Sequence, residues 1–251
     1  MPEAPNRADE RADRILDAAG ELLLRLGARK VTVEDIADRA GVGKGTVYLH
    51  WRTKEQLLEA VVLRDSVGVT GELLEQVREN PFEVLPHRFM RSSYLATFRS
   101  PLTAVLVTDT TGLLGRIKTG ALRESRALAA DRYFDTMRRY GLLRTDVPGL
   151  AYALQATASG FYLVDNLGVD TAGLDREAKA DALARTVRCA FEPAGEPEPA
   201  AVAAAAAALV AMFEELTTSH REWIYSNTRH VRHTQHTQHT QHGPAQTQEA
   251  G

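Results

Sequence analysis

The sequence predicts an all-α protein, with an N-terminal three-helix unit arranged as a helix-turn-helix and a larger helical domain after it. Three observations predict this class. Apolar residues recur at the three- or four-residue spacing of amphipathic helices along nearly the whole chain, and strand-like alternation is scarce. Isolated prolines and glycines divide the chain into segments of helix length. With 251 residues, of which 44% are hydrophobic, the chain can bury a core without disulfides or metals.

The first 60 residues predict four helices. Apolar residues within 15–26 line one face of the first helix, and the same spacing predicts a short second helix over 33–40. Thr32 is placed to cap the N-terminus of this second helix. A third short helix is expected over 44–50 after a tight turn, and Thr53 is placed to cap a longer fourth helix.

The rest of the chain predicts a helical body and a tail. Helices are expected near 82–99, 102–117, 121–140, 148–167 and 174–191, and over about 200–227 after the Pro/Glu-rich stretch 192–199. The last 22 residues hold five of the eight histidines in a His-Thr-Gln repeat, a composition that favours disorder. We therefore expect a helix-turn-helix domain at 1–56, a helical domain at 57–229 and a disordered tail at 230–251.

Composition predicts a cytoplasmic protein that does not enter membranes. The formal net charge is −3, so charge alone names no partner. The lone cysteine, Cys189, excludes a disulfide framework. Residues 1–14 lack the apolar core of a signal peptide. The longest apolar run, 200–213, is shorter than the ~20 residues of a membrane span.

Residues 12–58 have the organisation of a helix-turn-helix, whose second helix enters the major groove of DNA. Val47 is placed to anchor this helix inward, and Trp51 to complete its packing. The remaining side chains offer positive charge, close backbone approach and hydrogen bonds to phosphates and base edges. The candidate DNA-binding residues are Thr32, Val33, Gly43, Lys44, Gly45, Thr46, Tyr48, His50 and Lys54.

The segment IADRAGVGKGTVYLHWRTKEQLL resembles the DNA-binding signature of the tetracycline-repressor (TetR) family. The matching positions are Ala37, Ala40, Gly41, Val42, Gly45, Thr46, Val47, Tyr48, His50, Thr53, Lys54, Glu55 and Leu57. The resemblance implies a homodimeric transcriptional repressor that binds a palindromic operator in double-stranded DNA. It also implies release by a small-molecule effector, of unknown identity, bound in the helical body.

Two residues depart from that signature, and one stretch invites a different interpretation. Gly43 stands where the family has Ser or Thr, so we expect one phosphate contact fewer, and Trp51 replaces the usual Phe. The stretch GVGKGT resembles a phosphate-binding loop. The loop is incomplete because Asp38 stands at its first glycine position and Gly45 follows the lysine.

The body offers candidates for a dimer interface and a ligand pocket. Small residues within 148–168, together with 174–191, resemble the family's four-helix dimer interface, although they could also pack within one subunit. Aromatic side chains, and acidic ones on apolar stripes, are the candidate ligand-binding residues, with core or interface roles as the alternative: Tyr94, Phe98, Asp109, Tyr133, Tyr152, Phe161, Tyr162 and Asp165.

Two other functions are weighed against this one. The histidine repeat offers imidazoles to Zn, Ni or Cu, so a metal-responsive regulator that acts through 230–251 is an alternative. An enzyme with a DNA-binding head is the other, but the chain has no G-x-S-x-G, no H-E-x-x-H and no complete phosphate loop. We expect no enzymatic activity, no cofactor and no metal site.

Overall fold

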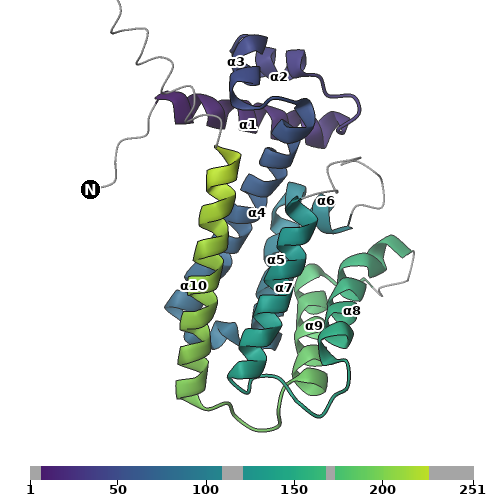
Figure 1. Cartoon of the computed structure of the whole chain (residues 1–251). Helices are drawn as coiled ribbons and strands as arrows, with labels where there is room; N and C mark the ends of the chain where they lie inside the picture. The colour runs from purple at the N-terminus through teal and green to yellow at the C-terminus, as the bar shows by residue number, and fades with distance from the viewer. Residues whose placement is uncertain (1–6, 109–120, 168–172, 226–251) are drawn as a thin grey trace, which may run out of the picture.

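The computed structural model describes residues 7–108, 121–167 and 173–225, and these ranges contain helices and no strand. This confirms the all-α prediction. Helices α1 (Arg7–Leu26), α2 (Val33–Ala40) and α3 (Lys44–His50), with the start of α4 (Lys54–Glu79), form a compact unit that we call the head. Figure 1 shows the head at one end of an elongated molecule, with α4 running from it into the body.

The caps expected in the head are formed. The Thr32 hydroxyl accepts a hydrogen bond from the Asp35 backbone N–H at 3.1 Å, and the Asp35 carboxylate accepts one from the Thr32 N–H at 3.1 Å. This reciprocal pair satisfies two amides that the first turn of α2 would leave without a partner. Gly41 ends α2 with a φ of 65°, in the left-handed region that glycine adopts without a steric penalty. The Thr53 hydroxyl accepts from the Gln56 N–H at 3.1 Å and begins α4.

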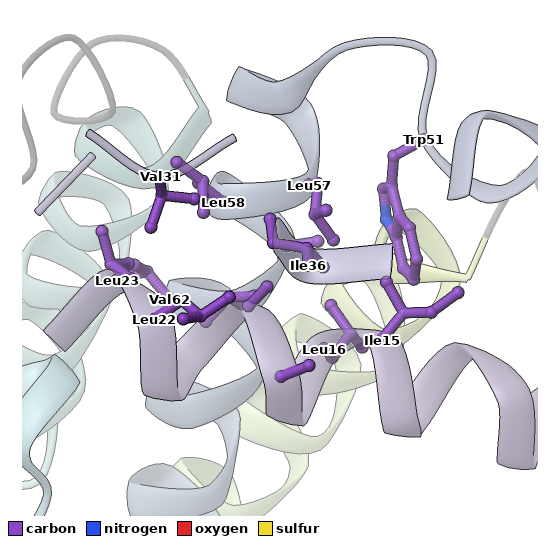
Figure 2. Packing of buried hydrophobic residues seen from close by; sticks show 14 of the residues in the cluster. Ile15, Leu16, Leu22, Leu23, Val31, Ile36, Trp51, Leu57, Leu58 and Val62 are labelled. Carbon is purple, nitrogen blue, oxygen red and sulfur yellow. The ribbon is translucent and has the colours of Figure 1, made fainter. Parts of the chain in front are cut away.

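A buried apolar cluster holds the head together, and it draws residues from the body as well. Figure 2 shows Ile15 and Leu16 of α1, Ile36 of α2 and the Trp51 ring packed around the start of α4. Leu102 and Leu106 from the body, and Ile224 near the described C-terminus, belong to the same cluster. The expected division between residues 56 and 57 falls inside α4, whose early apolar residues pack in this cluster.

The body contains the remaining elements. They are η1 (Pro81–Val84), α5 (Pro86–Arg99), α6 (Pro101–Thr108), α7 (Ala121–Arg139), α8 (Leu150–Leu163), η3 (Val164–Leu167), α9 (Arg176–Phe191) and α10 (Pro199–Ile224). The single helix expected near 82–99 is wrong. A 3-10 turn and α5 replace it, because Pro86 lacks the N–H that a continuous helix needs and instead starts α5.

Two other expected helices differ at their ends. The segment 148–167 begins its helix only at Leu150, after Gly149 with a φ of 65°, and its last four residues form the 3-10 turn η3. Of the helix expected near 102–117, the described part is α6, and residues 109–120 lie outside the described ranges.

Helix α10 is longer than the apolar run that predicted it. Its 26 residues meet the length and composition criteria of a membrane span, so the expectation that this segment is too short does not hold. One side of it packs in the body core, where Val202 and Leu209 are fully buried, and the helix lies along α4 (Figure 1). Its second half carries Glu214, Glu215 and Arg221, and charged residues are costly within a bilayer.

The C-terminal end of α10 is bound to the head. The Trp51 indole Nε1–H donates to the Ile224 carbonyl at 3.3 Å in a buried setting, and the Tyr225 hydroxyl donates to the Asp13 carboxylate at 2.6 Å. Burial, followed by this bond to Asp13, raises the pKa of Tyr225 above its ordinary value. The last helix therefore connects the far end of the body with the helix-turn-helix.

At the far end, a buried carboxylate joins α9 to α5. Glu192 accepts from the His87 backbone N–H at 2.6 Å and from Arg188 Nη1 at 2.7 Å. Burial would raise the pKa of Glu192, but the hydrogen bonds from His87 and Arg188 outweigh it and hold the pKa below the ordinary 4.5.

The Glu192→Gln variant tests this carboxylate. A lowered folded-state pKa adds stability above the unfolded pKa, and that stability is lost as the pH falls through the folded value. We expect the variant to be about 1–3 kcal/mol less stable at neutral pH, and the difference to shrink below about pH 4.5. Urea unfolding at several pH values measures it. The exposed Glu196→Gln variant is the control, and an equal, pH-independent difference in both variants would contradict the assignment.

Candidate nucleic-acid interface

Helix α3 presents one face to the core and the other to solvent. Val47 and His50 are buried, with 1% and 3% of their surface exposed. Tyr48 and Leu49 are 44% and 57% exposed, and Lys44 is exposed one turn earlier. Gly45 is also exposed, and a Cβ built on it would meet no atom within 4 Å. Residues 44, 45, 48 and 49 share a face at 3.6 residues per turn, and we call this the α3 face.

Lys44 forms an ion pair across the turn of the helix-turn-helix. Its ammonium contacts the Glu34 carboxylate in the first turn of α2. The hydrogen bond between them lowers the pKa of Glu34 and raises the pKa of Lys44. Both side chains are about half exposed, so the pair contributes little to stability in water. A DNA phosphate can therefore replace Glu34 as the partner of Lys44.

The other predicted DNA-binding residues are either accessible on α3 or engaged within the head. Thr46 lies half-buried on α3, and Gly43 begins that helix without a side-chain cap, as its lack of a hydroxyl requires. Thr32 is exposed and uses its hydroxyl in the α2 cap, whereas Val33 is buried. His50 is likewise buried, and its ring lies 5.4 Å from the Trp51 ring.

Lys54 has a structural role in this fold. Its Nζ donates to the backbone carbonyls of Ala28 and Val31, each at 3.0 Å. The ammonium thus joins the start of α4 to the loop between α1 and α2, and it is half-buried there. This engagement leaves Lys54 with less capacity for phosphate than the sequence alone indicated.

The Lys54→Met variant separates these two roles. Because the side-chain length is kept while two charge-assisted hydrogen bonds are lost, we expect the free energy of unfolding to fall by about 1.5–3 kcal/mol. The salt dependence of DNA binding should stay unchanged, since no phosphate contact is removed. Thermal unfolding and DNA titrations at several salt concentrations measure both. A lower salt slope with unchanged stability would show that Lys54 binds phosphate instead.

Leu49 and Glu34 are the residues of this interface that sequence reasoning missed. Leu49 is apolar, so its residue type gave no sign of exposure, but it lies one turn after Gly45 on the α3 face and is 57% exposed. An exposed leucine on a groove-facing helix can contact the methyl group of thymine. Glu34 could have been found from the excess of acidic residues near α2, but its pairing with Lys44 depends on how the two helices cross.

The predicted ligand-binding residues come together only in part. Tyr94, Phe98 and Tyr162 form an aromatic cluster, with ring centroids 4.8–5.9 Å apart. Tyr133 is buried against Phe89, with centroids 4.9 Å apart.

Of the other four, three lie in the described residues, and Asp165 is close enough to Tyr94 for its charge to raise the pKa of that phenol, after burial, the larger cause. Tyr152 is 80% exposed, and Asp165 is exposed and paired with Lys179 at 2.8 Å. Phe161 packs half-buried at the edge of the body core, and Asp109 lies outside the described residues.

A cavity of about 260 Å³ lies between the elements of the body. Its walls come from α4, α5, α6, α7, α8 and α10, and Tyr162 is the residue it shares with the predicted set. Helix α6 contributes Leu106, which also belongs to the head core. Among the described residues, no group of three or more His, Cys, Asp or Glu could hold a metal, and the histidine tail is outside them.

Comparison with known proteins gives the head its family. Residues 15–61 match the sequence family described as bacterial regulatory proteins, tetR family. The head of this chain therefore carries a DNA-binding segment of the tetR type. The match covers α2, α3 and the turn between them, together with most of α1 and the start of α4, so the predicted resemblance is confirmed.

Curated relatives of this chain are transcriptional regulators. It is 35% identical over 94 residues to the repressor KstR2 of Mycolicibacterium smegmatis, covering 36% of this chain and 45% of KstR2. It is 34% identical over 91 residues to the regulator TtgR of Pseudomonas putida, covering 36% of this chain and 42% of TtgR. The chain therefore spans less than half the length of these relatives.

Solved structures agree on the fold. A crystal structure of the Streptomyces coelicolor regulator SCO4942 has a TM-score of 0.51 and 23% identity, covering 72% of this chain and 98% of that one. The all-α architecture of head and body is thus shared with a solved protein.

Proposed function

We propose that this chain is a homodimeric, cytoplasmic transcriptional repressor that binds a palindromic operator and is released by a small molecule bound in its body. The observation that carries the proposal is the α3 face, an exposed surface on the second helix of a TetR-type helix-turn-helix. Lys44 supplies a charge for phosphate, while Tyr48 and Leu49 reach toward base edges. Residues 1–60 carry no excess of positive charge, so useful affinity requires two heads on one DNA site.

Helices α8 and α9 support the dimer. Tyr152, Gln155, Ser159 and Gly160 lie on one exposed face of α8. Small residues there permit close approach of a second subunit, and an 80% exposed tyrosine gains from burial in an interface. The two heads would then read half-sites roughly 34–36 Å apart, or multiples of that distance.

The cavity supports the ligand response, because α4 runs from it into the head and two further walls, α6 and α10, also reach the head. On α6, Leu106 lines the cavity and packs in the head core. On α10, Phe213 lines the cavity, and the same helix ends at the bond between Ile224 and Trp51. A ligand that changes the position of either helix changes the position of α3, and by reciprocity DNA binding lowers the affinity for that ligand.

Selection of DNA from a random pool by the purified full chain tests the proposed function. The proposal expects an enriched palindrome, bound by two copies of the chain as measured by analytical ultracentrifugation. Enrichment of a non-palindromic site by a single copy would overturn the dimeric assignment, and no enrichment would overturn DNA recognition itself.

A further inference from the structure

The geometry points to an uncharged, largely apolar ligand that donates a hydrogen bond as the molecule taken by the 260 Å³ cavity. This inference rests on the proposed ligand response and adds the chemical class of the ligand. Three properties of the cavity support it: its described walls carry no charge, its hydroxyl groups are oriented to accept, and its volume is small.

No described residue that lines the cavity is charged. On α4, the carboxylate of Asp65 precedes the lining residue Ser66, and its Oδ2 accepts three hydrogen bonds from Ser100 and Thr103 at the start of α6. It accepts from the Thr103 N–H at 2.9 Å, from the Thr103 hydroxyl at 2.6 Å, and from the Ser100 hydroxyl. A cation or an anion would enter this space without a counter-charge from these walls, and burial of an unpaired charge is strongly unfavourable.

Three hydroxyl groups in the cavity wall already donate their protons to groups of the protein. Ser66 donates its proton to the Val62 carbonyl at 3.0 Å, Thr70 donates to the Ser66 carbonyl at 2.9 Å, and Thr103 donates to Asp65. A hydroxyl has one proton and two lone pairs, so these three oxygens can only accept from a ligand. The wall therefore favours a ligand with an O–H or N–H group.

Thr97 supplies a second, independent indication of a polar ligand. Its surface is only 6% exposed, and it lines the cavity. Among the described residues, neither Thr97 nor the neighbouring Ser93 has a hydrogen-bond partner for its hydroxyl. No buried side-chain N or O atom of the described residues lacks a partner, so the Thr97 oxygen is open to the cavity, where a ligand can bond to it.

The other walls set size and shape. Phe89, Phe213 and Leu74 give the cavity an apolar and partly aromatic lining. Its volume is slightly below the range of about 300–1,000 Å³ of drug-sized pockets, so the ligand is small. A planar ring system with one hydroxyl meets all three requirements.

A matched set of naphthalene derivatives tests the proposal on the full chain. The probes are 2-naphthol, its methyl ether, 2-naphthoate and 2-naphthylmethylammonium, which share one ring system. The ether lacks the donor, the naphthoate adds a negative charge, and the ammonium ion keeps donors but adds a positive charge. Calorimetric titration should show 2-naphthol binding about three- to tenfold more tightly than the ether, and neither ion binding at comparable concentrations.

Two variants place the binding in this cavity. Thr70→Val and Thr97→Val keep the side-chain shape and remove one hydroxyl each, and each should weaken 2-naphthol about three- to tenfold. Thr70→Val should leave the ether unchanged, because the Thr70 proton is already donated to the Ser66 carbonyl. Thr136→Val is the matched control. Its hydroxyl makes the same kind of bond within its helix, to the Arg132 carbonyl at 2.8 Å, but does not line the cavity.

Each outcome decides the proposal. Equal binding of the ether and 2-naphthol, tighter binding of either ion, no binding of any probe, or equal effects in all three variants would overturn the ligand class. Operator titrations on the same samples report separately on the proposed function. If 2-naphthol binds as expected but leaves operator affinity unchanged, the ligand class stands and ligand-induced release fails.

Discussion

Replacing Trp51 with alanine is expected to lower the free energy of unfolding by about 3–5 kcal/mol, the cost of deleting a large buried aromatic side chain. The ring is 2% exposed and stands where α3 ends, against the residues of α1 and α2 seen in Figure 2. Its loss removes packing from the recognition helix and also removes the indole donor to the Ile224 carbonyl. Urea unfolding followed by circular dichroism measures the change.

Two further variants divide this effect between packing and hydrogen bonding. Trp51→Phe keeps most of the apolar ring but leaves the buried Ile224 carbonyl without its donor, so we expect a loss of about 1–3 kcal/mol. Leu49→Ala, on the exposed face of the same helix, should change stability by less than about 0.5 kcal/mol. Wild-type stability in Trp51→Phe would show that the bond to α10 contributes nothing, and a small effect of Trp51→Ala would contradict the packing of the head.

Replacing Lys44 with alanine is expected to weaken operator binding by about tenfold to a hundredfold. The proposed dimer would carry two copies of Lys44, and each releases about one counterion when it neutralises a phosphate. The slope of log K against log salt should therefore fall by about two. Fluorescence anisotropy with labelled operator at several salt concentrations measures both quantities.

The Glu34→Gln variant changes the other member of the ion pair between Lys44 and Glu34. It removes the competing carboxylate and leaves Lys44 in place, so binding to DNA of random sequence should become tighter. The fold should be unaffected because the pair is exposed. Equal operator affinity and salt slope in Lys44→Ala and the wild type would show that Lys44 stays paired with Glu34 in the complex.

Local sequence rules predicted most of the helices because their causes are local. Thr32, Gly41 and Thr53 act on atoms within a few residues, and the structure shows them doing so. The expected helix over 82–99 failed where one local rule competed with another, since the apolar spacing continued through Pro86. Here the missing N–H of proline outweighed the periodicity.

The side-chain roles in the interface were harder to predict because their partners lie far away in the chain. Lys54 bonds to carbonyls 23 and 26 residues earlier, and Trp51 bonds to one 173 residues later. In a helix of seven residues, spacing alone did not tell whether His50 or Leu49 faced outward.

The cavity was missed for a related reason. The predicted pocket relied mainly on aromatic residues, whereas serines and threonines on α4, α5 and α6 supply the polar atoms of the cavity wall. Such residues are common on exposed helix surfaces, so nothing in their spacing marked them as lining a pocket. Conversely, Tyr152 was predicted to line a pocket, but its side chain is exposed to solvent.

We propose that the α3 face reads the bases of an operator, and DNA selection with the wild type and with Leu49→Asn tests this proposal. Leucine favours contact with a thymine methyl group, whereas asparagine favours a pair of hydrogen bonds with adenine. We expect both proteins to enrich a palindrome, and we expect the two enriched sequences to differ at one or two base pairs in each half-site. Identical sequences from both proteins would show that Leu49 does not face the bases, and failure of the wild type to enrich any sequence would contradict the account as a whole.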